Sequence, residues 1–408
     1  MRKGRSSIWK TKSTYSVYVG KKLLSPFHDF YANDKTILRL AANRYFAHYN
    51  GEDIESSYWA LRKRAALFDV PERPLEILGR NATEFLNHVL TRRSDSLKIG
   101  SGHYTLACTH DGGIFIDGIL FRLEKDRFWL VQPDGELDAW LLAHSPNFDV
   151  SISDPQSRVL QIQGPLSFDI INAATNGSVD NKMGYFKSGF HFIGGQKVYI
   201  SRTGWSGELG YEIYTLGQKT DCRRLWSDLW DFGQPRGMIF SSMQAMNIRR
   251  IEAGIFDSGS DFDTSVGPAD VGLSKFVDMD KDYFIGRQAL LNRRRRQTIL
   301  GVLCDGYIPE AGDLVYFRGR RVGFITTGAY SPKFESGIGY ARLDFDQSYS
   351  DCELEVLSQD GSTYSCDPVQ LPFYDRNKLK PRTIATQNPT MRALNLKTDE
   401  KGGNDGAH

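Results

Sequence analysis

SRTGWSGELGYEIY, residues 201–214, joins a glycine-rich loop to a short strand. Gly204, Gly207 and Gly210 recur at every third position, a spacing that lets the backbone adopt positive φ or pass close to a ligand. The last five residues have strand character and place one carboxylate, Glu212, among apolar and aromatic neighbours. A carboxylate on a half-buried strand needs a hydrogen-bonding partner. The pattern indicates either an ordinary edge-strand glutamate or a ligand-binding one, and the rest of the chain decides between them.

The composition describes a multidomain globular protein. The chain has 408 residues, of which 40% are hydrophobic and 25% charged, so we expect two or three domains. Its 51 basic and 49 acidic residues give a net charge of +2, which argues against a general nucleic-acid binder. The five cysteines are widely spaced without a CxxC motif, which predicts reduced, cytosolic usage and no metal site. Apolar runs are too short to cross a membrane.

The two ends of the chain differ from its middle. Residues 1–29 form an N-terminal arm that is basic, rich in hydroxyl groups and free of acids until Asp29. A flexible or surface-pairing arm of a cytoplasmic protein is the preferred interpretation, and a mitochondrial presequence is the alternative. Residues 379–408 lose apolar content, which predicts a disordered tail.

Residues 30–150 have the pattern of a first α+β unit. Helical spacing covers 37–41 and 58–67, and Asn81 is a plausible cap for a further helix. From residue 102 onward, short strands form a meander with a glycine turn at 110–113. Asp117 lies in the middle of an apolar strand, where a buried carboxylate needs a donor or a cation. We therefore favour a functional role for Asp117 over that of a structural aspartate with satisfied hydrogen bonds.

Residues 151–285 repeat the same order of elements, which suggests a second α+β unit in a pseudo-duplicated architecture. Residues 286–378 then alternate short strands with Gly, Pro and Asp turns, which predicts a small all-β domain. A run of four arginines, 293–296, precedes its strands. Two interpretations of this run remain open, a solvated helix end and a docking site for an anionic tail or partner.

Several stretches in this part of the chain together resemble one family. They are IQGP (162–165), SRTGWSGELGYEIY (201–214), RRIEAG (249–254), GSDFD (259–263), GPADVGL (267–273), FIGRQAL (284–290) and VGFITTGAYSP (322–332). Each is weak alone, but seven in the family's order resemble the aminomethyltransferase, or glycine-cleavage T protein, folate-binding family. The resemblance implies two intertwined α+β units and a C-terminal β-barrel-like domain around a central opening that holds tetrahydrofolate.

The resemblance also implies a folate site. It makes Glu212 the carboxylate that binds the pterin, whose amino and ring N–H groups form a two-donor edge that a carboxylate can accept in parallel. Trp205 is expected against the flat ring or in the wall of the opening. The remaining cofactor-binding candidates are Tyr214, Arg202, Met246 and Tyr374.

Two departures from the family's pattern affect the expected chemistry. Met246 and Asn247 stand where glycine-cleavage T proteins usually have the arginine and aspartate of an ARD triplet. The glycine hairpin reads Ile116-Asp117, so only one of two usual acids is kept. These changes resemble the family's folate-dependent demethylases, either dimethylsulfoniopropionate demethylase-like or methoxy-aromatic acid demethylase-like members. A glycine-cleavage-type aminomethyltransferase and a non-catalytic folate-binding protein are the alternatives, although no KGC triplet supports the second.

We therefore expect transfer of a methyl group from a small methylated substrate to N5 of tetrahydrofolate. A sulfonium or ammonium donor is expected to bind in an aromatic cage, and after losing its methyl group it leaves as a neutral molecule. A methoxy-arene instead needs a proton from a tyrosine or histidine. Asp117 and Tyr104 are the predicted catalytic residues, and His103 and His110 are other possible acids. The predicted substrate-binding residues are Trp129, Asp134 and Phe121. The sequence leaves the oligomeric state open.

Overall fold

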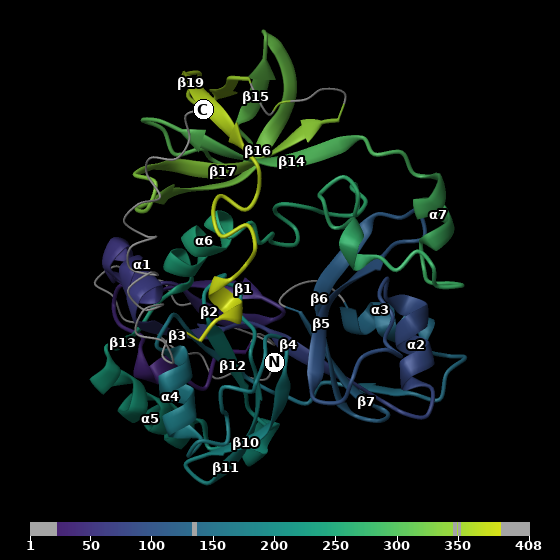
Figure 1. The fold of residues 1–408 in the computed structure, drawn as a ribbon, viewed down its shortest axis with the longest axis vertical. Helices are drawn as coiled ribbons and strands as arrows, with labels where there is room; N and C mark the ends of the chain where they lie inside the picture. Colours follow the sequence, from purple (N-terminus) through teal and green to yellow (C-terminus); the bar gives the residue numbers. More distant parts are fainter. Residues whose placement is uncertain (1–22, 133–136, 346–348, 350–351, 385–408) are drawn as a thin grey trace, which may run out of the picture.

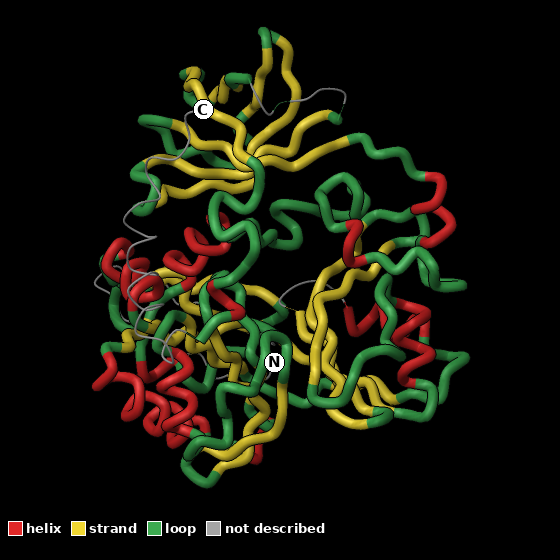
Figure 2. Tube along the Cα trace, in the orientation of Figure 1, coloured by secondary structure: helices red, strands yellow, loops and turns green. Residues whose placement is uncertain are grey.

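The computed structural model describes residues 23–132, 137–345, 349 and 352–384. Two mixed α+β bodies lie side by side, and a β-barrel sits across one end of both (Figures 1 and 2). This architecture confirms the predicted α+β fold with a C-terminal barrel. The arm before residue 23, the tail beyond 384 and Asp134 lie outside the described residues.

The first body is built on a six-stranded sheet. Its strand order is β10 (Ser188–Ile193), β11 (Gln196–Ser201), β12 (Gly210–Tyr214), β9 (Val159–Gln163), β3 (Ala65–Val70) and β13 (Met238–Phe240). Neighbours pair antiparallel except β13 and β3. Helices α4 (Ser167–Ala174) and α5 (Cys222–Gly233) cover one face, against which Tyr211 and Ile213 are buried. Because strand residues alternate, Glu212 and Tyr214 lie on the opposite face.

The second body is built on a five-stranded sheet. Its order is β5 (Ser101–Cys108), β6 (Ile114–Glu124), β7 (Arg127–Gln132), β4 (Arg73–Leu78) and β8 (Ser151–Ser153). Helices α2 (Ala82–Val89) and α3 (Leu137–His144) pack against one face of this sheet. Ile116 and Leu120 point into the core between that face and the helices. The other face carries Phe121 and Trp129, which share a buried cluster with Tyr214 of the first body. The two sheets therefore face each other, and the space between them is the natural place for a site.

Two helices close this space from the side of the barrel. Helix α1 (Ile54–Lys63) packs against α6 (Met243–Glu252), and both bury side chains beside the facing sheets. The side chain of Asp53 caps α1 by accepting a 3.0 Å hydrogen bond from the backbone N–H of Ser56. The shorter helices are α7 (Arg287–Asn292), η1 (His28–Phe30), η2 (Gly217–Lys219), η3 (Gln234–Arg236), η4 (Ser274–Phe276) and η5 (Lys380–Arg382).

The barrel is a closed ring of six antiparallel strands. Their order is β14 (Gln297–Cys304), β17 (Ser336–Asp344), β16 (Arg320–Ser331), β15 (Leu314–Phe317), β18 (Leu354–Leu357) and β19 (Thr363–Val369), and β19 pairs back with β14. After β19 the chain runs back over the α+β bodies, drawn yellow in Figure 1. Ile384 packs there against the core beneath the six-stranded sheet. In the described part of the chain, no helix has the length and apolar character needed to span a bilayer.

The predicted helical segment at 37–41 is wrong. Residues Ile37–Ala41 form strand β1, which pairs antiparallel with β2 (Arg44–Tyr49). The two residues between the strands, Ala42 and Asn43, both have positive φ, 46° and 63°. A two-residue turn of this kind matches the twist of a hairpin, so turn geometry overrides the helical spacing of the leucines.

The prediction of reduced cysteines is also wrong. Cys304 and Cys366 form a disulfide, and they lie directly opposite each other where β14 pairs with β19. The two residues are 62 positions apart in the chain, so only closure of the barrel brings them together. The cysteine pattern consequently gives no argument for a reducing compartment. Cys108 and Cys222 are free thiols.

Candidate functional site

Glu212 lies on β12, buried on the face that looks toward the five-stranded sheet. Its Oε2 accepts hydrogen bonds from the hydroxyls of Thr203 (2.5 Å), Tyr214 (2.6 Å) and Ser201 (3.3 Å). Its Oε1 accepts one bond, of 2.9 Å, from Nε2 of Gln161. These donors are all neutral, and burial raises the pKa of the carboxyl above its ordinary value.

Gln161 is the site residue that the sequence reasoning missed. It stands directly opposite Glu212 in the pairing of β9 with β12. Its amide nitrogen donates to Glu212 and, at 3.0 Å, to Glu72, but its Oε1 is buried without a partner among the described residues. The residues around it, VLQIQ, alternate polar with apolar inside a fully buried strand. That alternation was the available signal, since buried amides are seldom left unpaired.

The glycines of the 201–214 stretch serve two purposes. Gly207 has φ of 69°, so it needs the conformational freedom of glycine. Gly204 and Gly210 instead make room for Gln163, because a Cβ at either would lie 2.2 Å from its amide. That amide accepts a 2.6 Å hydrogen bond from the Ser206 hydroxyl and donates to the Thr203 carbonyl. Gln163 therefore fixes the loop that carries Thr203, one of the Glu212 partners.

Asp117 lies on β6, on the side of the five-stranded sheet that faces Glu212's sheet. Tyr104 and Asp117 are diagonal neighbours across the β5–β6 ladder, because Tyr104 pairs with Ile119 and Leu106 with Asp117. The Tyr104 hydroxyl donates a 2.8 Å hydrogen bond to Oδ2 of Asp117. Burial, and then the adjacent carboxylate, raises the pKa of Tyr104 well above its usual value. The structure thus brings together the two residues predicted to be catalytic.

The two histidines considered as alternative acids lie elsewhere. His103 pairs with Leu120 in the ladder, so it points toward the opposite face of the sheet from Tyr104. Burial, and then the nearby charge of Arg92, lowers the pKa of His103 to about 4, so its imidazole is neutral at pH 7. His110 is exposed at the hairpin turn, with its ring centroid 5.7 Å from that of His144.

Phe121, Trp129, Tyr214 and Met246 belong to one buried cluster between the two sheets. The Trp129 ring lies 5.9 Å from the Tyr214 ring, and the Phe121 ring lies 6.0 Å from it. The indole N–H of Trp129 donates a 3.0 Å hydrogen bond to Glu76. The four side chains are fully buried, so they form the apolar wall beside the polar group around Glu212.

Trp205 and Arg202 flank this region. Trp205 is half-buried, its ring lies 5.2 Å from the guanidinium of Arg250, and its N–H donates to the Phe256 carbonyl. Arg202 is buried and donates to the backbone carbonyls of Met183 (2.9 Å) and Pro381 (3.1 Å). Arg202 therefore ties the loop to the returning C-terminal segment.

Tyr374 lies at a buried charge network between the α+β bodies and the barrel. Its ring lies 4.9 Å from the guanidinium of Arg62 and 5.1 Å from that of Arg249. Both arginines bind Glu208, at 3.0 and 2.9 Å, and both bind Glu252, at 3.4 and 2.7 Å. The Tyr374 hydroxyl is buried without a partner among the described residues. Glu252 also accepts hydrogen bonds from Tyr58 and Ser331.

Comparison with known proteins agrees with this architecture. Residues 29–281 match the model of the GCVT N-terminal domain, and residues 295–375 match that of the glycine cleavage T-protein C-terminal barrel domain. The chain therefore belongs to the glycine cleavage T-protein family. As a member it is a transferase of folate-dependent one-carbon transfer, and tetrahydrofolate is the co-substrate of the family.

Individual relatives agree over most of the chain. It is 30% identical over 341 residues to the aminomethyltransferase of Alkaliphilus oremlandii, covering 81% of this chain and 91% of that protein. It is 31% identical over 324 residues to the aminomethyltransferase of Pseudothermotoga lettingae, covering 77% and 88%. The solved glycine cleavage system aminomethyltransferase T from Bartonella henselae has the same fold, with a TM-score of 0.78, 24% identity, and coverage of 87% of this chain and 98% of that one.

Proposed function

We propose that this protein moves a methyl group from a small cationic methyl donor to tetrahydrofolate. The proposal rests on the Tyr104–Asp117 pair, which is joined by a 2.8 Å hydrogen bond. The pair lies on the face of the five-stranded sheet that is turned toward the sheet of Glu212. Asp117 acts there as the counter-charge of the substrate, and Tyr104 holds its carboxylate in place. The proposal names a finer activity than the one-carbon transfer that defines the family.

The residues around Glu212 fit the folate that the family uses. Oε2 of Glu212 already accepts three hydroxyl donors, whereas Oε1 accepts one. Oε1 of Gln161, beside it in the ladder, accepts none among the described residues. Two neighbouring acceptors suit the two-donor edge of a pterin. The pterin would therefore donate one hydrogen bond to Oε1 of Glu212 and one to Oε1 of Gln161, rather than both to Glu212. When bound, tetrahydrofolate supplies N5 as the nucleophile.

Two buried side chains favour methyl transfer over aminomethyl transfer. Ile116, at the position of the family's second hairpin acid, points into the core beneath the sheet and away from Asp117. Met246, at the position of the family's folate-contacting arginine, is buried in the apolar cluster between the sheets. Neither position supplies a charge that could steer a proton between substrate and folate. Methyl transfer suits this site better, because it needs only the alignment of N5, the methyl carbon and the leaving atom.

None of the three acids considered, all of them among the described residues, is ready to donate a proton, which favours a sulfonium or quaternary ammonium substrate. The Tyr104 hydroxyl already donates its hydrogen bond to Asp117, and its raised pKa makes it a poor acid. His103 is neutral and faces away, and His110 is at the exposed turn. In a cationic donor the bond from methyl carbon to sulfur or nitrogen breaks, and its electron pair stays on the departing atom. That atom leaves neutral and needs no acid, whereas a methoxy-arene leaves as a phenolate that does.

The test is the formation of 5-methyl-tetrahydrofolate, measured by mass spectrometry. The protein is mixed with tetrahydrofolate and, separately, a dimethylsulfonio acid, a trimethylammonio acid and a methoxybenzoate. We expect product from a cationic donor and none from the methoxybenzoate. If every methylated donor fails while the protein still binds tetrahydrofolate, the proposal is wrong.

Variants of the pair test its role. Asp117→Asn removes the counter-charge without changing size, and we expect kcat/KM to fall by about 100-fold or more, the scale of a lost positioned charge. Tyr104→Phe removes only the hydrogen bond and should cost about tenfold. Asp149→Asn, an exposed carboxylate on the same body, serves as the control and should leave kcat/KM unchanged. Equal losses in Asp149→Asn and Asp117→Asn would reject a specific role for Asp117.

A second candidate function is aminomethyl transfer. It is favoured by the names of the relatives at about 30% identity, which the chain matches over nine-tenths of their length. Release of ammonia from an aminomethyl-loaded carrier protein, with tetrahydrofolate present, distinguishes it from demethylation.

A further inference from the structure

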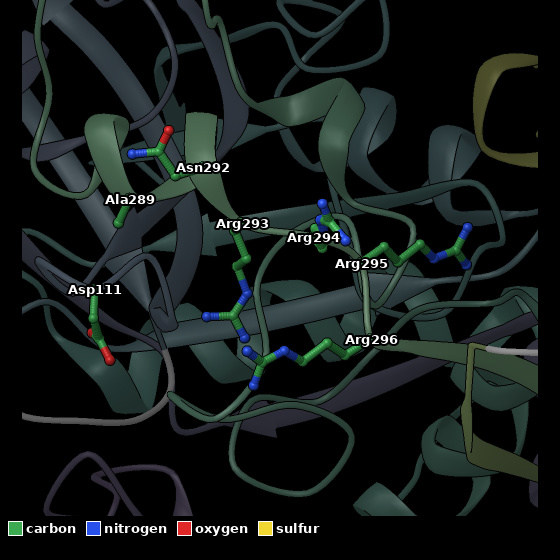
Figure 3. Close-up of a pocket in the computed structure, with 7 residues that line it drawn as sticks. All are labelled: Asp111, Ala289, Asn292, Arg293, Arg294, Arg295 and Arg296. Atoms are coloured by element: carbon green, nitrogen blue, oxygen red, sulfur yellow. The ribbon is translucent and has the colours of Figure 1, made fainter.

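The four successive arginines line a pocket of about 580 Å³ at the junction of α7, the β5–β6 turn and the barrel. Figure 3 shows the side chains of Arg293 and Arg296, which both line this pocket. We call this the arginine pocket. Its lining residues are Asp111, Ala289, Asn292, Arg293, Arg294, Arg295 and Arg296.

The backbone of this run is held in place and is not a loose linker. Asp270 is buried, and its Oδ1 accepts hydrogen bonds from the backbone N–H groups of Arg296 (2.8 Å) and Gln297 (3.2 Å). Its Oδ2 accepts from the N–H of Gly267 (2.8 Å) and from Nη2 of Arg293 (3.3 Å). Arg293 donates a further 2.8 Å hydrogen bond to the Ser265 carbonyl. One carboxylate therefore fixes both ends of the run.

The pocket has more positive charge than its neighbours neutralise. Arg295 lies 4.0 Å from the centre of the Phe345 ring and donates to Thr298 at 2.7 Å. The guanidinium groups of Arg294 and Arg296 have no hydrogen-bond acceptor or ion-pair partner among the described residues. Two carboxylates, Asp270 and Asp111, stand against four arginines, which leaves two positive charges. Adjacent like charges repel, and an anion between them removes that cost.

We propose that the arginine pocket binds a small molecule bearing two adjacent phosphate groups. Guanidinium groups donate paired hydrogen bonds that match phosphate oxygens, and two uncompensated charges match a diphosphate better than a single carboxylate. The volume is that of a small-ligand site. The chain's near-neutral total charge argues against an extended nucleic acid as the ligand. This inference is independent of the proposed reaction, because Glu212 and Gln161 do not line the pocket.

The test is calorimetric titration of the full chain with pyrophosphate and adenosine diphosphate at low salt. We expect binding that weakens as salt is raised, because screening reduces the contribution of exposed charges. The double variant Arg294→Gln/Arg296→Gln should weaken pyrophosphate binding by about tenfold or more. The matched control is Arg320→Gln/Arg321→Gln, which removes the same charge from an exposed hairpin of the barrel and should leave binding unchanged.

Three results overturn the inference. They are no binding of pyrophosphate at low salt, equal weakening in both double variants, and equally tight binding of a tri-glutamate peptide. The last result would assign the pocket to carboxylate-rich partners instead of phosphates. Thermal unfolding midpoints of both double variants, compared with the parent, establish that each is folded before its binding is interpreted.

Discussion

Glu208 and Glu212 lie four residues apart in one stretch, and both are buried, yet their surroundings differ in kind. Glu208 lies between two guanidinium groups, those of Arg62 and Arg249, at 3.0 and 2.9 Å. Glu212 is surrounded by three hydroxyls and one amide and has no ion pair among those found in the described residues. The charge of Glu208 is therefore neutralised by two arginines, whereas Glu212 receives hydrogen bonds from neutral groups only.

This difference separates a structural carboxylate from a binding one. A carboxylate between two arginines has its charge and its lone pairs used, so it offers little to a ligand. A carboxylate held by neutral donors keeps its charge and an open acceptor site, at some expense in stability. In the sequence, the two are simply glutamates of one glycine-rich stretch, Glu208 in its loop and Glu212 in its strand. The following experiments test whether their roles separate as their partners do.

The largest expected effect is on folding stability in Glu208→Gln. The substitution leaves two buried guanidinium groups facing one remaining carboxylate, Glu252, so we expect the free energy of unfolding to fall by about 3–5 kcal/mol. Urea denaturation measures this change. Arg80→Gln breaks the exposed pair with Asp149 and should change stability very little. A Glu208→Gln protein as stable as the parent would reject the structural role of Glu208.

The next effect is on ligand affinity in Glu212→Gln. We expect the Kd for tetrahydrofolate to rise by about 10- to 100-fold, since a charged acceptor is replaced by a neutral amide. Stability should change by only about 1 kcal/mol, because the hydroxyls of Ser201, Thr203 and Tyr214 can rotate to accept from the amide. Fluorescence titration and urea denaturation measure the two quantities. Unchanged affinity would reject Glu212 as the pterin carboxylate.

The pH dependence of stability gives a third test. Burial raises the pKa of Glu212 above its ordinary value of 4.5, so the folded state holds the proton more tightly than the unfolded state. This group's contribution to stability is complete below pH 4.5 and is lost as pH rises through the raised pKa, by at most about 1.4 kcal/mol per pH unit. Unfolding free energies at stepped pH should show that decline in the parent and a smaller one in Glu212→Gln. Parallel curves would contradict it.

The smallest expected effect is in Tyr214→Phe. The substitution removes one of three donors to Oε2 of Glu212 and leaves the ring in the cluster between the sheets. We expect a loss of about 1 kcal/mol in stability, the usual contribution of one hydrogen bond. Tetrahydrofolate affinity should fall less than in Glu212→Gln, which isothermal titration can measure. A greater loss of affinity than in Glu212→Gln would mean that Tyr214 contacts the ligand directly.

Local pattern predicted much of the fold but failed where long-range geometry decides. Alternation and turn residues identified the β5–β6 hairpin, and the motif order identified the barrel. The strand at 37–41 was missed because its leucines also fit helical spacing, and a two-residue turn decides the outcome. The Cys304–Cys366 disulfide was missed because its residues meet only when the barrel closes.

The candidate site divides in the same way. Glu212, Asp117 and Tyr104 were predictable from a carboxylate in an apolar strand and from the family resemblance. Gln161 was not, because its importance comes from its position opposite Glu212 in a strand pairing between segments about fifty residues apart. The arginine run was visible in the sequence, but its rigidity depends on Asp270, whose hydrogen bonds only the folded chain shows.

Strand β3 has a consequence for how the protein is made. It is synthesised early, at residues 65–70, yet it lies between β9, at 159–163, and β13, at 238–240. The six-stranded sheet therefore cannot be completed until more than half the chain has left the ribosome. Both edges of β3 are unpaired until β9 emerges, and one edge stays unpaired until β13 emerges, which is a hazard for aggregation. We expect fragments ending before residue 238 to need chaperone protection, whereas the barrel takes all six of its strands from one contiguous segment, residues 297–369.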